Sequence, residues 1–212
     1  MNRFKTTLAI IINLAVFILS TVGNYIAYSR NGNNTFYYYT QLSNIFLAAA
    51  SLVYAFFLFK ELKNKDYRMP QFIRIIKYMA TSIITVTFFI VMTVLAPMAL
   101  PDGIDAAIHV IIGGSCLYQH LFSPVLSIAS FIFLEGNEKY TVKDNILAII
   151  PTLAYAIILV YINIVKIFDG PYPFLRVHNQ PVWASAAWFV VILSIAYVLA
   201  FVLRRFQIIK ND

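Results

Sequence analysis

Six long apolar segments alternate with short polar stretches along this chain. Each contains about 20 or more mainly apolar residues, which is the length that a helix needs to cross a bilayer. The predicted spans are 6–28, 38–59, 75–100, 107–134, 146–166 and 182–203. Because these spans use most of the 212 residues, no separate soluble domain fits. We therefore expect an all-α, single-domain bundle of six transmembrane helices.

Composition and charge support this interpretation and add an orientation. Hydrophobic residues make up 61% of the chain and charged residues 12%, unlike a soluble domain. Thirteen of the 16 basic residues fall in alternate connecting segments: Arg3, Lys5, Lys60, Lys63, Lys65, Arg68, Arg74, Lys77, Lys139, Lys143, Arg204, Arg205 and Lys210. The remaining connecting segments, on the opposite side of the membrane, hold only three basic residues: Arg30, Lys166 and Arg176. The positive-inside rule then places both termini in the cytoplasm, and no basic, aromatic-rich patch indicates a nucleic-acid partner.

The fourth span carries ionisable side chains inside an apolar stretch. On one helix, a single face would hold His109, Gly113, Cys116, His120, Ser123 and Ser127. An ionisable residue inside a membrane normally faces the bundle interior or a wet cavity, so His120 is a functional candidate. The alternative is a neutral histidine that hydrogen-bonds two helices together, with Gly113 and Ser115 allowing close approach.

Polar faces are also expected on the first two helices. Asn13, Phe17, Ser20 and Asn24 share one face of the first helix, which should face the bundle. The second helix opens with consecutive aromatic residues, typical of a membrane-interface belt, and then places Thr40, Ser43 and Asn44 on one face. Three hydrogen-bonding side chains near the membrane surface favour a pocket wall.

Two loops differ in their expected roles. The loop after the fifth span contains two prolines, and its residues Tyr172, Phe174, Arg176 and His178 would either anchor it at the interface or form the rim of a lid over a pocket. The loop after the fourth span, with Glu135, Glu138, Lys139 and Lys143, is expected to be a solvated turn of mixed charge.

Few catalytic chemistries fit these residues. The chain has no HExxH motif, no Gly-x-Ser-x-Gly elbow and no carboxylate pair within a span. On one helix His109 and His120 would lie about 16 Å apart, too far to share a metal. With a single cysteine there is no disulfide, and we expect no metal or cofactor. A nucleophile with a histidine base remains, either Thr40 or Cys116 with His120.

Three short segments resemble one membrane-protein family. They are Tyr39-Thr40-Gln41-Leu42-Ser43-Asn44, His120 followed by Pro124, and Tyr172-Pro173-Phe174-Leu175. Together with the six-helix layout they resemble the androgen-induced-gene and androgen-dependent TFPI-regulating membrane proteins (FAR-17a-like) and their six-pass bacterial relatives. The animal proteins space the histidine and proline one residue further apart. The bacterial relatives have an Asp-Trp pair where this chain has Ser130 and Phe131.

The resemblance implies an intramembrane hydrolase of fatty acid esters of hydroxy fatty acids or similar lipid esters, in a bacterial plasma membrane. Thr40 would be the nucleophile and His120 the base, with Ser43 or Asn44 available to bind the oxyanion. Counted from the predicted inner helix ends, Thr40 lies about 28 Å and His120 about 21 Å along the helices, a gap that tilt can absorb. An acyl transferase fits the same residues.

Two other classes of function stay open. In a small transporter or permeability protein, Asn24, Thr40, Asn44, His109 and His120 would line a polar path. The spans offer no buried acid for ion coupling and no evident repeat between the two three-helix halves, which argues against transport. In a structural or regulatory membrane protein, the polar residues would only pack helices.

Overall fold

Each predicted span corresponds to a helical segment in the computed structural model, which describes residues 2–64, 66–135 and 140–211. Lys65, Glu138 and Lys139 lie outside the described residues. Every regular element in the described ranges is helical, and six segments are long and apolar enough to cross a membrane. They are Arg3–Tyr37, Tyr39–Lys63, Gln71–Met98, Leu117–Leu134, Val142–Ile164 and Val182–Gln207. The predicted all-α, six-span architecture is confirmed.

The first three spans form one side and the centre of the bundle. Helix α1 (Arg3–Asn31) continues through the 3₁₀ turn η1 (Gly32–Tyr37) into α2 (Tyr39–Lys63), which packs along it. Helix α3 (Gln71–Ile90) is central and contacts α2, α6, α7 and α8. The π-helical segment η2 (Val91–Leu95), α4 (Ala96–Met98) and the turn η3 (Leu100–Asp102) extend it.

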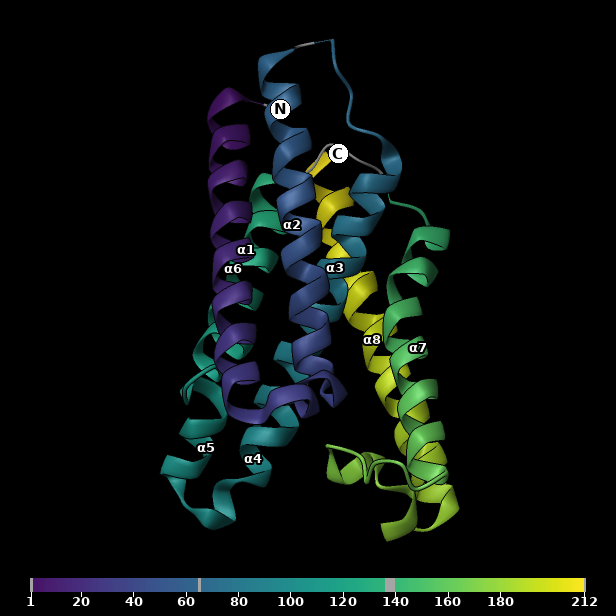
Figure 1. Cartoon of the computed structure of the whole chain (residues 1–212). Helices are drawn as coiled ribbons and strands as arrows, with labels where there is room; N and C mark the ends of the chain where they lie inside the picture. The colour runs from purple at the N-terminus through teal and green to yellow at the C-terminus, as the bar shows by residue number, and fades with distance from the viewer. Residues whose placement is uncertain (1, 65, 136–139, 212) are drawn as a thin grey trace.

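The remaining elements complete the bundle. They are α5 (Ile104–Ile112), the π-helical η4 (Leu117–Phe122), α6 (Ser123–Ala129), the π-helical η5 (Ser130–Leu134), α7 (Val142–Ile164), the turns η6 (Pro173–Leu175) and η7 (Val177–Asn179), and α8 (Val182–Asn211). Both chain ends lie at one end of the bundle (Figure 1), which we call the terminal end. Helices α4 and α5 and the loop 165–181 lie at the opposite end, called the loop end.

The fourth span is not the continuous helix that its apolar sequence predicts. Helix α5 ends at Ile112, and Gly114 adopts φ +58°, a left-handed conformation that glycine adopts without strain. The chain becomes helical again only at Leu117. The prediction that His109, Gly113 and His120 lie on one helix face is therefore wrong, and so is the 16 Å separation derived from it.

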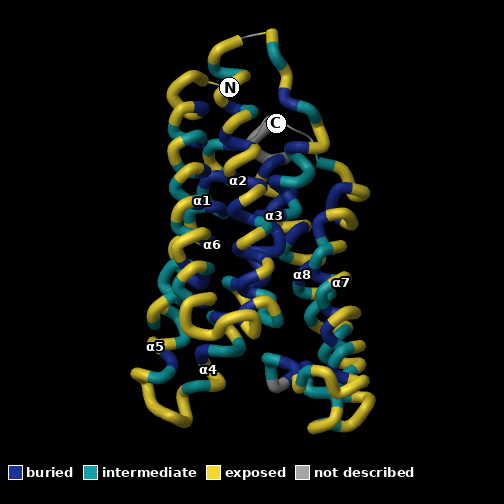
Figure 2. Tube along the Cα trace, in the orientation of Figure 1, coloured by how far each residue is buried: buried dark blue, intermediate teal, exposed yellow. Residues whose placement is uncertain are grey.

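Buried positions gather toward the centre of the bundle and exposed positions along its outside (Figure 2), and many of the exposed residues are large and apolar, as a membrane bundle requires. Asn13 and Ser20 of α1 are fully buried, and Thr40, Ser43 and Asn44 of α2 are also buried. The bundle-facing orientation predicted for both helices is confirmed. Residues 80–87 of α3 are buried without interruption, which fits a helix surrounded by other helices on all sides.

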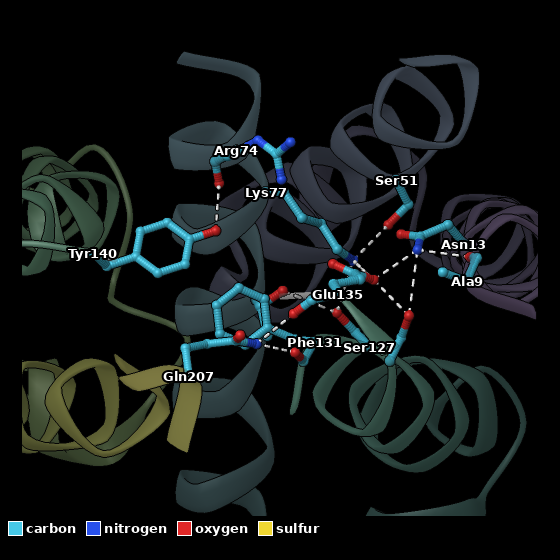
Figure 3. Close-up of polar contacts among 12 residues, drawn as sticks. Ala9, Asn13, Ser51, Arg74, Lys77, Ser127, Phe131, Glu135, Tyr140 and Gln207 are labelled. Carbon is cyan, nitrogen blue, oxygen red and sulfur yellow. Dashed lines mark hydrogen bonds and ion pairs between the residues drawn. The ribbon is translucent and has the colours of Figure 1, made fainter. Parts of the chain in front are cut away.

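A buried ion pair lies between the helices toward the terminal end. Lys77 Nζ lies 3.7 Å from Glu135 Oε1, and only 1% and 2% of the two side chains are exposed. Glu135 Oε1 also accepts hydrogen bonds from Asn13 Nδ2 (2.7 Å) and Ser130 Oγ (2.5 Å). Lys77 Nζ donates to the hydroxyls of Ser51 and Ser127 at 3.4 Å each. These six residues form what we call the Glu135 cluster (Figure 3).

This cluster corrects two sequence interpretations. Lys77 is a basic residue inside the bundle instead of a residue of a cytoplasmic loop, and Glu135 is buried instead of solvated. The π-helical η5 ends directly before Glu135, and the side-chain amide of Gln207 donates to the carbonyls of Phe131 and Glu135. The cluster and Gln207 thus connect α1, α2, α3, α6, η5 and α8, so one set of polar contacts fixes the relative positions of five spans.

Candidate active site

A cavity of about 530 Å³ lies at the loop end and contains both residues predicted to be catalytic. This volume is within the usual range for small-molecule sites. Its lining residues are Asn31, Tyr38, Thr40, Gln41, Leu95, Met98, Ala99, Asp102, Val110, Ser115, Cys116, Gln119, His120, Pro171 and Tyr172. We call it the His120 cavity. Thr40 comes from the first turn of α2 and His120 from η4, so the fold unites two residues 80 positions apart.

His120 is oriented by a backbone carbonyl. Its Nδ1 lies 2.6 Å from the carbonyl oxygen of Val110, near the end of α5. A carbonyl oxygen can only accept a hydrogen bond, so Nδ1 carries the proton, and in a neutral ring Nε2 then carries the free lone pair. The break at Gly113–Gly114 makes this contact possible because it lets α5 turn back beside η4, and α5 contacts η4 directly. The geometry prepares Nε2 to accept a proton.

Thr40 lies where the start of α2 meets the loop 165–181. Its side chain is 5% exposed and lies within hydrogen-bonding reach of the Tyr172 side chain. Burial raises the pKa of Tyr172 above its ordinary value, so this phenol stays protonated at neutral pH. The hydroxyl of Thr40 therefore lies among uncharged groups on this side of the cavity.

Two glutamines that were not among the predicted site residues complete the polar wall. Gln41 Nε2 donates to Gln119 Oε1 at 3.0 Å, while Gln119 Nε2 has no hydrogen-bond partner in the described structure. Gln119 is 1% exposed, and an unpaired buried amide is costly. Gly23 permits its position, because a Cβ there would lie 2.7 Å from Gln119 Cγ. Gln119 thus keeps a buried, unpaired amide donor, and the residue belongs to the same cavity wall as Thr40 and His120.

Most of the other predicted pocket residues lie elsewhere. Cys116 does line the His120 cavity, but His109 is exposed and Asn24 Nδ2 bonds the carbonyl of Ser20, and neither lines the cavity. Ser43 Oγ bonds Thr87 Oγ1 at 2.9 Å and the Thr40 carbonyl at 3.0 Å. Its hydroxyl is therefore occupied by contacts within and between helices.

Asn44 joins three helical segments one turn beyond Thr40 along α2. It is fully buried, and its Nδ2 donates to the carbonyls of Thr40 (2.9 Å) and Gln119 (3.3 Å). Its Oδ1 accepts from Ser20 Oγ at 3.3 Å. With both ends of the amide engaged, Asn44 joins α1, α2 and η4, and it does not line the cavity.

The loop 165–181 covers part of the site with its first half only. Tyr172 lines the His120 cavity, and Phe174 lines a small apolar pocket that also contacts Thr40. Tyr172 stacks on Phe174 and meets Tyr38 edge-on. Arg176 instead donates to the carbonyl of Gly170, at 3.2 Å.

The predicted rim position of His178 is not where the structure places it. His178 Nε2 contacts the carbonyl of Asn163 at 3.0 Å, and its ring lies in a separate groove beside α8. Asn163 also bonds Phe168 and Val177, so it anchors the loop to the end of α7.

No protein-family model, curated protein or solved structure matches this chain at a significant level.

Proposed function

We propose that this protein is an intramembrane hydrolase of lipid esters, with Thr40 as nucleophile and His120 as general base. The observation that carries the proposal is the Nδ1 contact of His120 with the Val110 carbonyl, which leaves Nε2 as the basic atom of a ring that lines the same cavity as Thr40. A hydroxyl is a weak nucleophile at neutral pH and needs such a base. The family resemblance of the sequence points to the same pair.

In the proposed reaction, Thr40 Oγ1 attacks the ester carbonyl carbon while His120 Nε2 takes the hydroxyl proton. The oxyanion accepts a hydrogen bond from Gln119 Nε2, which replaces Ser43 and Asn44 in this role because their donors are already engaged. The C–O bond of the ester breaks, and the departing alcohol receives the proton from His120. Water then cleaves the acyl-Thr40 ester with the same base and releases the fatty acid. Transfer of the acyl group to another alcohol would follow the same steps.

Transport is the second candidate, and one observation favours it. Glu135, which the sequence predicted to be solvated, is a membrane-buried acid beside Lys77. Asn44, however, is fully buried one turn beyond Thr40 toward the terminal end, and its hydrogen bonds with Gln119 and Ser20 put packed polar contacts on that side of the His120 cavity. Such packing fits an enzyme better than a continuous path across the membrane.

The proposed nucleophile is tested by hydrolysis of lipid esters with purified protein in liposomes. Thr40→Ala is expected to reduce turnover by roughly a thousandfold or more, because the attacking oxygen is lost. Thr40→Ser should retain part of the activity, since its hydroxyl survives. Cys116→Ala is the matched control from the same cavity and should stay near the wild-type rate. If Thr40→Ala hydrolyses the ester at the wild-type rate, or if Cys116→Ala loses activity, the nucleophile would be the Cys116 thiol instead of Thr40.

We further propose that the protein lies in a bacterial plasma membrane with both termini in the cytoplasm, supported by the distribution of basic residues. In a Cys116→Ser background, Lys63→Cys should react with a membrane-impermeant thiol reagent only from the cytoplasmic side. Arg30→Cys, at the other end of the spans, should react only from outside. Labelling of both positions from one side would refute this topology.

A further inference from the structure

We propose that the groove between α2 and α7 is a port through which a hydrocarbon chain of a membrane lipid ester reaches Thr40, and that Tyr39 and Tyr155 gate it. The groove has a volume of about 440 Å³, and Leu42 and Phe46 of α2 and Ile158 and Ile162 of α7 contribute to its walls. The proposal rests on the proposed function, because only an ester that reacts at Thr40 needs this route.

The groove exists because α2 and α7 each pack on other helices. Helix α2 packs on α1 and α3, and α7 packs on α3 and α8. Ile83 of α3 is left as a floor between them. Ser43 also lines the groove, but its hydroxyl bonds Thr87. The surface offered to a ligand is therefore mainly aliphatic and aromatic.

Two tyrosines separate this groove from the nucleophile. Tyr39 and Tyr155 line both the groove and the small apolar pocket beside Thr40, and their rings meet edge-on at 5.0 Å. The Tyr39 hydroxyl bonds Thr152 Oγ1 at 2.7 Å, and the Tyr155 hydroxyl donates to the Tyr37 carbonyl at 2.8 Å. These bonds satisfy both phenols in an apolar setting and hold the rings in place.

The gate is closed in this structure. The pocket behind it has a volume of only about 50 Å³, against about 440 Å³ for the groove outside. Thr40 lines this small pocket and also the polar His120 cavity. Rotation of the two rings would join the groove, the small pocket and Thr40 into one passage, with the polar cavity at its end.

A hydrocarbon chain is the occupant that fits both ends of this passage. At the mouth, Leu42 is 39% and Ile158 61% exposed, and both belong to membrane-spanning segments that lipid chains surround. At the inner end, the His120 cavity presents Gln41, Gln119 and His120 to the polar ester. An amphipathic ester can thus place its chain in the groove and its carbonyl at Thr40.

The test fills the groove and compares substrates. Leu42→Trp adds a large ring to the groove wall, and Ile45→Trp is the matched control, since Ile45 is 41% exposed one turn further along α2 and does not line the groove. Leu42→Trp is expected to lower kcat/KM for a hexadecanoyl ester roughly tenfold or more and to leave an acetyl ester within about twofold. Ile45→Trp should change neither.

Three results would overturn the proposed port. Leu42→Trp could lower kcat/KM equally for both esters, it could lower it for neither, or Ile45→Trp could show the same dependence on chain length. A second measurement separates this outcome from failure of the proposed function. A photoactivatable phospholipid with its reactive group on the acyl chain should label peptides around Pro151 and Ile158 in the wild type, and less in Leu42→Trp. Labelling of the groove without any ester hydrolysis would contradict the proposed hydrolase activity but still support lipid binding in the groove. Labelling spread evenly over the lipid-facing helices would contradict the port itself.

Discussion

Replacing Lys77 by methionine is expected to lower the free energy of unfolding by about 3–5 kcal/mol, the usual cost of removing one partner from a buried ion pair. The variant would leave Glu135 charged, 3% exposed and without its cation. The hydrogen bonds from Asn13 and Ser130 would remain, but neutral donors do not balance a charge in an apolar interior. Thermal unfolding of the purified protein in detergent measures the loss.

The double variant Lys77→Met/Glu135→Gln separates the charge effect from simple loss of packing. It removes both charges and keeps side chains of similar size, so it should recover most of the stability that Lys77→Met loses. Lys143→Met, which removes an exposed lysine, is the control and should unfold within about 0.5 kcal/mol of the wild type. A stable Lys77→Met protein would show that Glu135 does not need the ammonium group.

His120→Ala is expected to reduce lipid-ester turnover by roughly 10²–10⁴-fold, the usual contribution of a general base. The reason is geometric: the Val110 carbonyl fixes the proton on Nδ1, so Nε2 is the basic atom that we propose serves Thr40. Since the two residues act as one unit, Thr40→Ala/His120→Ala should be no slower than Thr40→Ala alone. Initial rates on liposomes containing the ester, with melting curves for each variant, check both statements.

His109→Ala provides a control with the same residue type. His109 is exposed on α5 and lies outside the His120 cavity, so its removal should leave turnover within about twofold of the wild type. A His109→Ala protein as impaired as His120→Ala would mean that the defect comes from displacement of α5. Additive losses in the Thr40 and His120 double variant would contradict a shared mechanism.

The composition of the candidate site was only partly predictable. Thr40, His120, Cys116 and Tyr172 were expected from polarity and motif, and they line one cavity. Gln41 and Gln119 were missed because an amide near a membrane interface is easily taken for a solvated or packing residue. The adjacent residues Gly113 and Gly114 were a signal for a helix break, but the apolar residues around them also fit one continuous span.

By itself, the sequence determined the all-helical architecture, the six spans and the inward-facing sides of the first two helices. These follow from local properties: apolar length fixes what can cross a bilayer, and a period of 3.6 residues fixes which side chains share a face. Only the tertiary structure decided which polar residues meet. The contacts of Lys77 with Glu135 and of His120 with Val110 depend on π-helical turns and on a glycine in a left-handed conformation. Such local departures rotate side chains from the faces that a regular helix would give them, and the energy that selects them comes from neighbouring helices.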